Sequence, residues 1–255
     1  MPQITLITGA TSGIGLACAN RLAKEGHWLI INGRRIERLQ ELKNRLVQEH
    51  QVQVLALPFD VRNVKTVEKT FDDLKAPWTE IDNLINNAGL ALGFDPIDNG
   101  LLADWEQMID TNIKGLLYVS RAVIPFMKAR KSGHIINIGS VAGREIYPKG
   151  NVYCATKHSV DALSQAMRID LLEHGIKVTQ ISPGAVETEF SQVRFHGDLD
   201  KASKVYQGFK PLTGADVAEV VAFALSLPKH VNINDMLLMP TAQATASLIN
   251  RNLNQ

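Results

Sequence analysis

Short apolar runs rich in β-branched residues alternate along this chain with longer segments of helical period, and no other feature constrains the fold as strongly. Such alternation is typical of a parallel sheet covered by helices. Strands are expected at residues 4–8, 28–32, 52–57, 83–85, 134–138, 177–181 and 236–239. Helices are expected at residues 14–25, 36–49, 64–74, 103–130, 153–174 and 215–225. The sequence therefore predicts an α/β fold, with a seven-stranded parallel sheet and helices on both faces.

The alternation runs through the 255 residues without a Pro/Ser-rich linker, a repeat or a low-complexity tract. A single domain spanning residues 1–255 is therefore expected. Residues 189–213 break the rhythm, because they carry mixed charge, aromatic side chains that include Phe195, Tyr206 and Phe209, and scattered glycines. A long irregular segment is usually a functional lid or a disordered excursion. We interpret this one as a lid over the substrate.

Composition excludes several classes of function. Lys and Arg number 27 against 26 Asp and Glu, a net charge of +1 that offers no broad surface for nucleic acid or an anionic membrane. The two cysteines fit a reducing compartment, and the chain shows neither a signal peptide nor an apolar run near the ~18 residues of a membrane span. The seven histidines have no metal-binding spacing. A cytoplasmic protein without nucleic-acid, membrane or metal partners is expected.

The turn that follows the first strand is rich in glycine and leads directly into a helical pattern. Glycines at such a turn let the backbone approach a phosphate, and the helix N-terminus supplies free N–H donors and partial positive charge. The spacing does not fit G-x-G-x-x-G, so a turn that needs only glycine flexibility remains an alternative. The residues expected to bind a dinucleotide are Gly9, Thr11, Ser12, Gly13, Ile14 and Gly15.

The second strand ends in Arg34 and Arg35. An NAD site places a carboxylate there for the ribose 2′-hydroxyl, whereas NADP carries a 2′-phosphate that requires cations. Glu37 lies nearby, but it falls in the first turn of the next helix, where the helix dipole explains an acidic residue. The sequence thus favours NADP, and the alternative is that both arginines merely begin a solvated helix.

Tyr153 and Lys157 lie four positions apart on a helical segment, so their side chains share a face. An ammonium ~4 Å from a phenol, at an effective dielectric constant of ~20, lowers the phenol pKa by up to ~3 units. The phenol would then work as a general acid or base near neutral pH. Ser140 ends the fifth expected strand at the same sheet edge and can hydrogen-bond a substrate carbonyl. Tyr-x-x-x-Lys pairs are also common on solvated helix faces.

In order and spacing, these motifs resemble the short-chain dehydrogenase/reductase family over essentially the whole chain. The resemblance rests on Thr-Gly-x-x-x-Gly-x-Gly at residues 8–15, Asn-Asn-Ala-Gly at 86–89, Asn112, Ser140, Tyr-x-x-x-Lys at 153–157 and Pro-Gly at 183–184. It implies a Rossmann-type doubly wound fold and hydride transfer at a nicotinamide. It also implies a catalytic tetrad of Asn112, Ser140, Tyr153 and Lys157, in which Asn112 anchors a proton-relaying water.

The resemblance further assigns contacts to the cofactor. It implies that Asp60 and Val61 lie at the adenine, and that Tyr153 and Lys157 contact the nicotinamide end. The remaining implied contacts are Asn87, Ala88 and Gly89 near the adenosine ribose, and Pro183, Gly184, Val186 and Thr188 at the nicotinamide. Members of the family pair the helices that begin here near residues 103 and 153, which implies a homotetramer.

Four segments are similar to one subgroup, the NADP-dependent 3-hydroxy acid dehydrogenases: residues 86–93, 110–115, 188–195 and 232–240. That subgroup acts on serine, L-allo-threonine and related acids, and on malonic semialdehyde in the reductive direction. We therefore expect an NADP-dependent enzyme for the 3-hydroxyl of small 3-hydroxy acids, including 3-hydroxypropionate. The alternatives are a reductase for another carbonyl (a 3-oxoacyl thioester, a pterin or a xenobiotic ketone) and a non-catalytic NADP-binding sensor.

A buried substrate carboxylate needs a cation or several donors. The candidates are Arg194 in the lid segment, Arg144 after the serine strand, and Lys210. We favour Arg194, because a lid would bring it over the nicotinamide when substrate binds. Ser140 and Tyr153 would hold the reacting oxygen. The alternative for Arg194 is a solvated loop residue.

Overall fold

The computed structural model describes residues 2–252 and has a central parallel sheet of seven strands. The strand order is β3-β2-β1-β4-β5-β6-β9. This arrangement confirms the predicted fold class. The strands are β1 (Ile4–Ile7), β2 (Trp28–Gly33), β3 (Val54–Pro58), β4 (Ile81–Asn86), β5 (Gly133–Ile138), β6 (Ile176–Pro183) and β9 (Asp235–Leu238).

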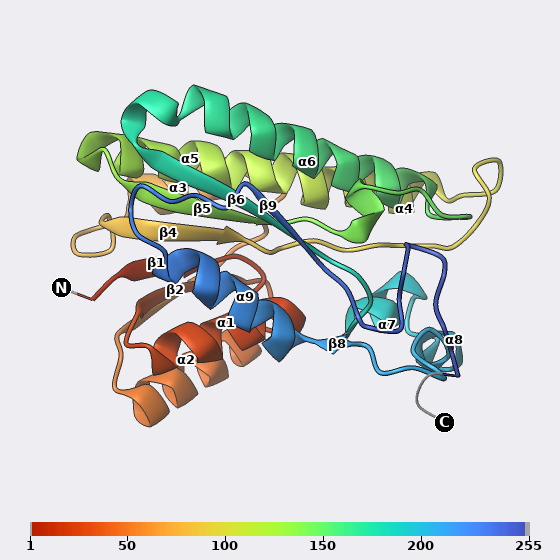
Figure 1. The fold of residues 1–255 in the computed structure, drawn as a ribbon. Coiled ribbons are helices and arrows are strands. Elements are labelled where there is room, and N and C mark those ends of the chain that lie inside the picture. The colour runs from red at the N-terminus through yellow and green to blue at the C-terminus, as the bar shows by residue number, and fades with distance from the viewer. Residues whose placement is uncertain (1, 253–255) are drawn as a thin grey trace.

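Helices cover both faces of the sheet (Figure 1). One layer holds α1 (Gly13–Lys24), α2 (Ile36–His50) and α9 (Gly214–Ser226), and the other holds α3 (Val64–Asp72), α5 (Leu116–Arg130) and α6 (Asn151–Asp170). Successive side chains of a strand point to opposite faces, so each central strand contributes to both cores. Ile31 packs with the first layer and Ile30 with the second. This double burial explains the nearly continuous apolar runs of the strands.

The chain crosses the sheet at its middle, and this crossing positions the functional site. The first three strands proceed outward from β1 to β3, after which the chain returns to place β4 on the other side of β1. Ligands of doubly wound folds bind at such a switch point, outside the carboxyl ends of the strands.

One helix expected at residues 103–130 is in fact interrupted. It consists of α4 (Leu102–Ile109), a π-helical segment η1 (Asp110–Gly115) and α5. The apolar spacing continues through the interruption, so the sequence pattern could not indicate it. A π segment inside an α-helix is rare and is often found at a functional site. This one contains Asn112.

The segment 189–213 is more regular than expected. It contains α7 (Phe190–Arg194), α8 (Leu199–Lys204) and β8 (Leu212–Thr213), which pairs with β7 (Val186–Glu187) in a second, two-stranded sheet. Strands of two residues have no periodicity, so the sequence did not predict them. The helices α7 and α8 lie beyond the carboxyl ends of the central strands (Figure 1). Within residues 2–252, no helix has the length and apolar character needed to cross a membrane.

Candidate active site

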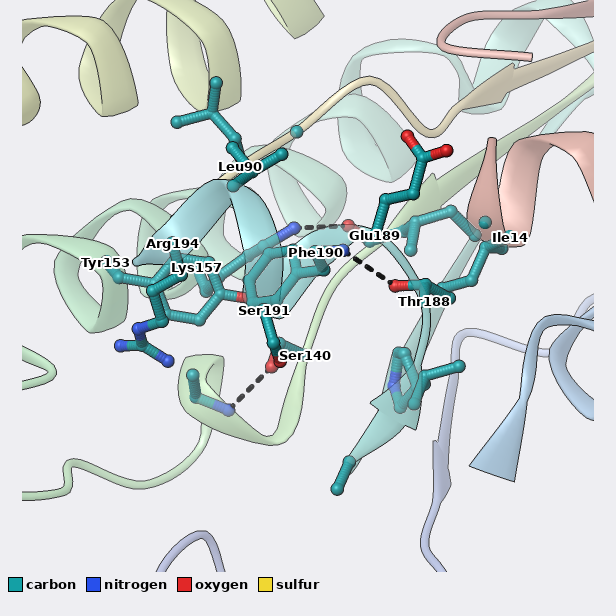
Figure 2. Close-up of a pocket in the computed structure, with 18 of the residues that line it drawn as sticks. Ile14, Leu90, Ser140, Tyr153, Lys157, Thr188, Glu189, Phe190, Ser191 and Arg194 are labelled. Atoms are coloured by element: carbon teal, nitrogen blue, oxygen red, sulfur yellow. Dashed lines mark hydrogen bonds between the residues drawn. The ribbon is translucent and has the colours of Figure 1, made fainter. Parts of the chain in front are cut away.

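A cavity of about 830 Å³ opens at the carboxyl ends of the central strands. Its volume lies within the range of ~300–1,000 Å³ typical of small-molecule sites. Its lining includes Ser140, Tyr153, Lys157 and Arg194, and it also includes every residue expected to contact the cofactor except Gly15. Figure 2 shows several of these side chains, which come from segments far apart in the sequence. Asn112 is the one member of the expected tetrad that does not line the cavity.

The glycine turn forms one wall and is held by Asn87. Gly9 and Gly13 have φ angles of +65° and +54°, which favour glycine. The Asn87 amide donates to Thr8 O at 2.9 Å and to Gly9 O at 3.1 Å. A Cβ on Gly15 would lie 2.4 Å from Asn87 Nδ2, so Gly15 permits this contact rather than facing the cavity.

The N-terminus of α1 faces the same cavity. Ser12, its N-cap residue, lines the cavity and makes no side-chain capping hydrogen bond. The first N–H groups of a helix lack partners within the helix, and together with the dipole they favour a bound anion. The turn therefore fits the diphosphate of a dinucleotide.

Two arginines stand at the end of β2, where the 2′-position of an adenosine ribose is expected. Arg35 donates to Thr11 Oγ1 at 3.2 Å and to Glu189 Oε2 at 3.0 Å. Arg34 Nη1 lies 3.9 Å from Asp60 Oδ2, while Arg62 holds Asp60 at 2.6 Å. Both arginines line the cavity and keep about half of their side-chain surface exposed. Their charge and position fit NADP better than NAD.

Tyr153, Lys157 and Ser140 converge on the opposite part of the cavity (Figure 2). Lys157 Nζ donates to Ile138 O at 2.9 Å and lies 5.9 Å from the centre of the Tyr153 ring. Ser140 Oγ accepts a hydrogen bond from Ala142 N at 3.1 Å. A side-chain hydrogen bond also joins Ser140 to Tyr153, so a substrate oxygen could bind both hydroxyls.

The predicted lowering of the Tyr153 pKa by Lys157 is not found. Burial raises the pKa of Tyr153, Tyr147 raises it further, and the opposing effects of Ser140 and Arg194 are smaller. Burial also lowers the pKa of Lys157 to about 8. The prediction considered only attraction between the charges and omitted the cost of removing each charged group from water.

Asn112 lies behind the cavity wall. Its side chain accepts from Leu90 N at 2.9 Å and donates to Leu90 O at 2.8 Å and to Thr156 Oγ1 at 3.0 Å. The residue thereby ties the π segment to the loop after β4 and to α6. Its expected part in proton relay remains a prediction.

Arg194, on α7, lies close to Tyr153. Its guanidinium carbon is 5.5 Å from the Tyr153 ring centre, 5.4 Å from that of Tyr147 and 5.1 Å from that of Phe94. Its Nη2 donates to Tyr147 Oη at 2.7 Å. The segment 189–213 therefore places a cation beside the phenol of Tyr153. Its expected part in binding the substrate carboxylate stays a prediction.

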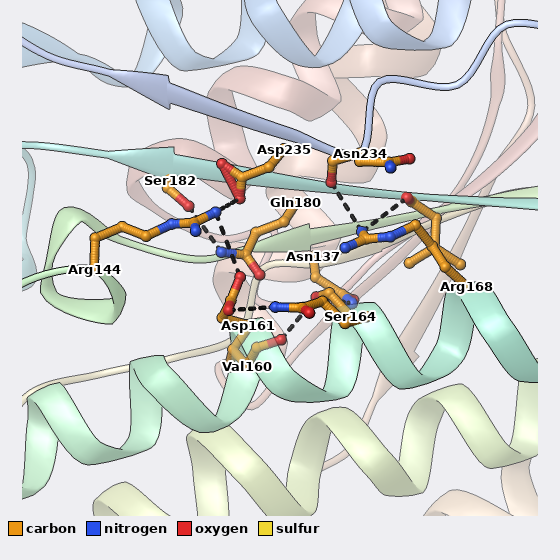
Figure 3. Close-up of polar contacts among 12 residues, drawn as sticks. Asn137, Arg144, Val160, Asp161, Ser164, Arg168, Gln180, Ser182, Asn234 and Asp235 are labelled. Atoms are coloured by element: carbon orange, nitrogen blue, oxygen red, sulfur yellow. Dashed lines mark hydrogen bonds and ion pairs between the residues drawn. The ribbon is translucent and has the colours of Figure 1, made fainter.

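The other two cations considered for the substrate lie elsewhere. Arg144 pairs with Asp161 at 3.4 Å and with Asp235, outside the cavity (Figure 3). Lys210 is not among the residues that line the cavity.

Sequence reasoning missed several parts of the site. The aromatic side chains Phe94, Tyr147 and Phe190 surround Arg194 and Tyr153. They lie on loops or a short helix, and only their aromatic character could have drawn attention to them. The segment near the C-terminus also contributes, through Gln243, Ala246, Ser247, Ile249 and Arg251. In residues 2–252, no group of three or more His, Cys, Asp or Glu side chains could hold a metal ion.

Comparison with known proteins identifies the family. A sequence model of short chain dehydrogenases matches residues 3–198. The chain belongs to the short-chain dehydrogenase family. This result confirms the resemblance deduced from the motifs, and it agrees with the position of Ser140, Tyr153 and Lys157 around one cavity.

Several relatives of this short-chain dehydrogenase carry specific names. The chain is 50% identical over 247 residues to the NADP-dependent 3-hydroxy acid dehydrogenase of Salmonella typhi, covering 96% of this chain and 98% of the other. It is 46% identical over 245 residues to sulfoacetaldehyde reductase 2 of Chromohalobacter salexigens, covering 96% of each. A solved structure of serine dehydrogenase in its closed form with NADP+ has a TM-score of 0.91 and 49% identity, covering 97% of this chain and 99% of that one.

Proposed function

We propose that the chain is an NADP-dependent oxidoreductase that oxidises the 3-hydroxyl of small 3-hydroxy acids, or reduces the matching aldehyde or ketone. Serine, allo-threonine and 3-hydroxypropionate represent this class, with malonic semialdehyde as a reductive counterpart. The observation that carries the proposal is the position of Arg194, whose guanidinium carbon lies 5.5 Å from the centre of the Tyr153 ring. A cation there could bind the acid group of a short substrate whose hydroxyl oxygen reacts at Tyr153. The named relatives support the same class.

The cofactor would bind along the cavity. The glycine turn and the start of α1 would hold the diphosphate, and Arg34 and Arg35 the 2′-phosphate. The nicotinamide would lie against Pro183, Gly184, Val186 and Thr188. When bound, the nicotinamide supplies the hydride acceptor or donor at the substrate carbon.

The proton would move through Tyr153. In reduction, the phenol of Tyr153 gives its proton to the carbonyl oxygen, while the Ser140 hydroxyl donates a hydrogen bond to the same atom. In oxidation, the phenolate accepts the alcohol proton. Lys157, whose Nζ lies 5.9 Å from the centre of the Tyr153 ring, would stabilise that phenolate electrostatically when it is protonated.

The substrate class can be tested by initial rates with serine, allo-threonine, 3-hydroxyisobutyrate and 3-hydroxypropionate, each with NADP+ and NAD+. We expect turnover of these acids with a strong preference for NADP+. A preference for NAD+ would contradict the assignment of Arg34 and Arg35.

A hydroxy sulfonate is a second candidate substrate. A guanidinium binds a sulfonate much as it binds a carboxylate, and one relative is named a sulfoacetaldehyde reductase. Including 2-hydroxyethanesulfonate in the same panel decides between the two acid groups by their kcat/KM values.

The Arg194→Met variant tests how the acid group is bound, because methionine keeps much of the packing against the aromatic rings. Its KM for 3-hydroxypropionate should rise by about 10- to 100-fold, the loss of a hydrogen-bonded charge contact of ~1.5–3 kcal/mol. 1,3-Propanediol, which lacks the carboxylate, is the matched control and should respond little. Equal effects on both substrates would show that Arg194 acts through packing alone.

The Tyr153→Phe variant separates an enzyme from a cofactor-binding sensor. Removing the hydroxyl should leave NADP+ binding intact, measured by titration, and should lower turnover by at least ~100-fold. Undiminished turnover would eliminate Tyr153 as the acid or base.

A further inference from the structure

The lid is joined to the cofactor end of the cavity by an acidic side chain. Glu189 directly precedes α7 and lines the cavity. Its Oε2 accepts from Arg35 Nη1 at 3.0 Å, and its Oε1 accepts from Arg38 Nη1 at 2.8 Å. Each oxygen of one carboxylate thus binds a different arginine of the β2–α2 region.

Arg35 has a second fixed contact, with Thr11 Oγ1 at 3.2 Å. Its guanidinium is therefore aimed at the space between the glycine turn and the lid, where the site for a 2′-phosphate is expected. The carboxylate of Glu189 already occupies one donor of this guanidinium, Nη1. A carboxylate and a phosphate use the same planar donor pairs of arginine, so the two anions are chemical equivalents for Arg35.

We propose that Glu189 is an internal anion that competes with the 2′-phosphate of NADP for Arg35, and so limits how strongly the chain prefers NADP over NAD. This inference rests on the proposed cofactor and is independent of the substrate. Glu189 is held ionised for this role. Burial raises its pKa, but the hydrogen bonds and charges of Arg35 and Arg38 together outweigh burial, so the pKa is lowered from its ordinary value.

The ion pairs of Glu189 are partly exposed, with 42% of its side-chain surface accessible. Exposed ion pairs are weak, so the competing carboxylate can be displaced by a ligand of higher charge. The expected effect is a moderate reduction in affinity for the 2′-phosphate and no effect on a ligand that lacks it.

The test uses the adenosine ends of the two cofactors as probes, measured by calorimetric titration of the full chain. These probes are 2′,5′-ADP, which carries the 2′-phosphate, and 5′-AMP, which lacks it. Glu189→Gln keeps the shape of the side chain and removes the competing charge. Its Kd for 2′,5′-ADP should fall about threefold to tenfold, in keeping with the loss of weak ion pairs, while the Kd for 5′-AMP stays within about twofold.

Glu187→Gln is the matched control. Glu187 lies two positions earlier, is exposed, and has no ion pair among the described residues. This substitution removes the same charge from the same region without releasing Arg35, so the Kd for neither 2′,5′-ADP nor 5′-AMP should change more than about twofold. Unchanged melting temperatures of both variants would confirm that each is folded.

Three results would overturn the inference. Weaker or unchanged binding of 2′,5′-ADP by Glu189→Gln would mean that Glu189 orients Arg35 or has no part in phosphate binding. An equal gain in Glu187→Gln would assign the effect to long-range charge. Equal affinity of the wild type for both probes would also refute the proposal that the cofactor is NADP. This result therefore separates failure of the cofactor assignment from failure of the competition alone.

Discussion

Tyr153 and Lys157 occupy an environment that opposes the charged form of both side chains. Burial raises the pKa of the phenol and lowers that of the ammonium to about 8. The phenol is therefore protonated at neutral pH, which suits a proton donor in carbonyl reduction. Oxidation of an alcohol needs the phenolate instead, so the two directions place opposite demands on the same residue.

A difference in pH dependence follows for the two directions. Because the raised pKa of Tyr153 makes its phenolate scarce at pH 7, kcat/KM for 3-hydroxy acid oxidation should increase steadily from pH 7 to pH 10. Reduction, which uses the phenol, should not increase over this range. Stopped or continuous NADPH absorbance assays in both directions provide the measurement. An oxidation rate that is flat across this range would contradict the raised pKa.

The Lys157→Met variant tests the burial of the ammonium through stability. The folded pKa of about 8 lies below the ordinary value of 10.5, so between these pH values the unfolded chain binds a proton that the folded chain does not. This residue therefore makes the wild type more stable as pH rises through that window. Methionine removes the effect, and the melting temperature of the variant relative to wild type should fall between pH 7 and pH 10. A difference in melting temperature that does not change with pH would show that burial does not lower the pKa of Lys157.

At the scale of elements, the π segment η1 turns a continuous helical pattern into a support for the site. It presents Asn112 to Leu90, whose N–H and C=O both bind the asparagine side chain, and to Thr156 on α6. Leu90 and Lys157 both line the cavity. A single buried amide therefore joins three segments that border the cavity.

Asn112→Ala should consequently destabilise the fold as well as reduce turnover. It leaves the buried N–H and C=O of Leu90 without these partners, at a cost of about 2–4 kcal/mol. The melting temperature should fall by roughly 5–15 °C, measured by calorimetry. Lys114→Ala, which removes an exposed ion pair from the same π segment, is the control and should change it little. A similar small change in both variants would show that the Asn112 hydrogen bonds contribute nothing.

Elements and motifs differ in how far they can be predicted from sequence. The strands and the glycine turn were predictable because their signals are local: apolar runs, and glycines at positive φ such as Gly9. The contacts of Glu189 with Arg35, and of Arg194 with Tyr147, join residues 154 and 47 positions apart. No local pattern encodes them, since they depend on how the segment 189–213 is placed beyond the carboxyl ends of the strands. The π segment was missed for another reason, because its apolar spacing resembles that of an ordinary helix.

At the scale of the whole molecule, polar side chains join the last strand to the rest of the fold. Arg144 pairs with Asp161 on α6 and with Asp235 on β9, and Arg168 donates to Asn234 O at 2.9 Å (Figure 3). These contacts fix an edge strand that only β6 pairs with in the sheet. Residues 243–251, which follow this strand, then reach the cavity. The edge of the sheet thus contributes to the site although it lies far from the glycine turn in the sequence.

The remaining prediction is that the chain forms a homotetramer, and the outer face of the α5–α6 layer is the expected subunit interface. Ile169 on α6 and Leu172 just after it are each 76% exposed, and Leu117 on α5 is 38% exposed. Large apolar side chains this exposed often mark a subunit interface. We expect light scattering coupled to size exclusion to give four times the chain mass of 28.1 kDa.

Replacing both Ile169 and Leu172 by Glu should then yield a smaller assembly, because burying unpaired carboxylates in an apolar contact is costly. Val47→Glu is the matched control, since Val47 is 41% exposed on α2, in the opposite helical layer (Figure 1). It adds an acidic group without touching this face, and its mass should equal that of the wild type. A double variant that keeps the wild-type mass would place the interface elsewhere, whereas a wild type that runs as a single chain would remove the tetramer altogether.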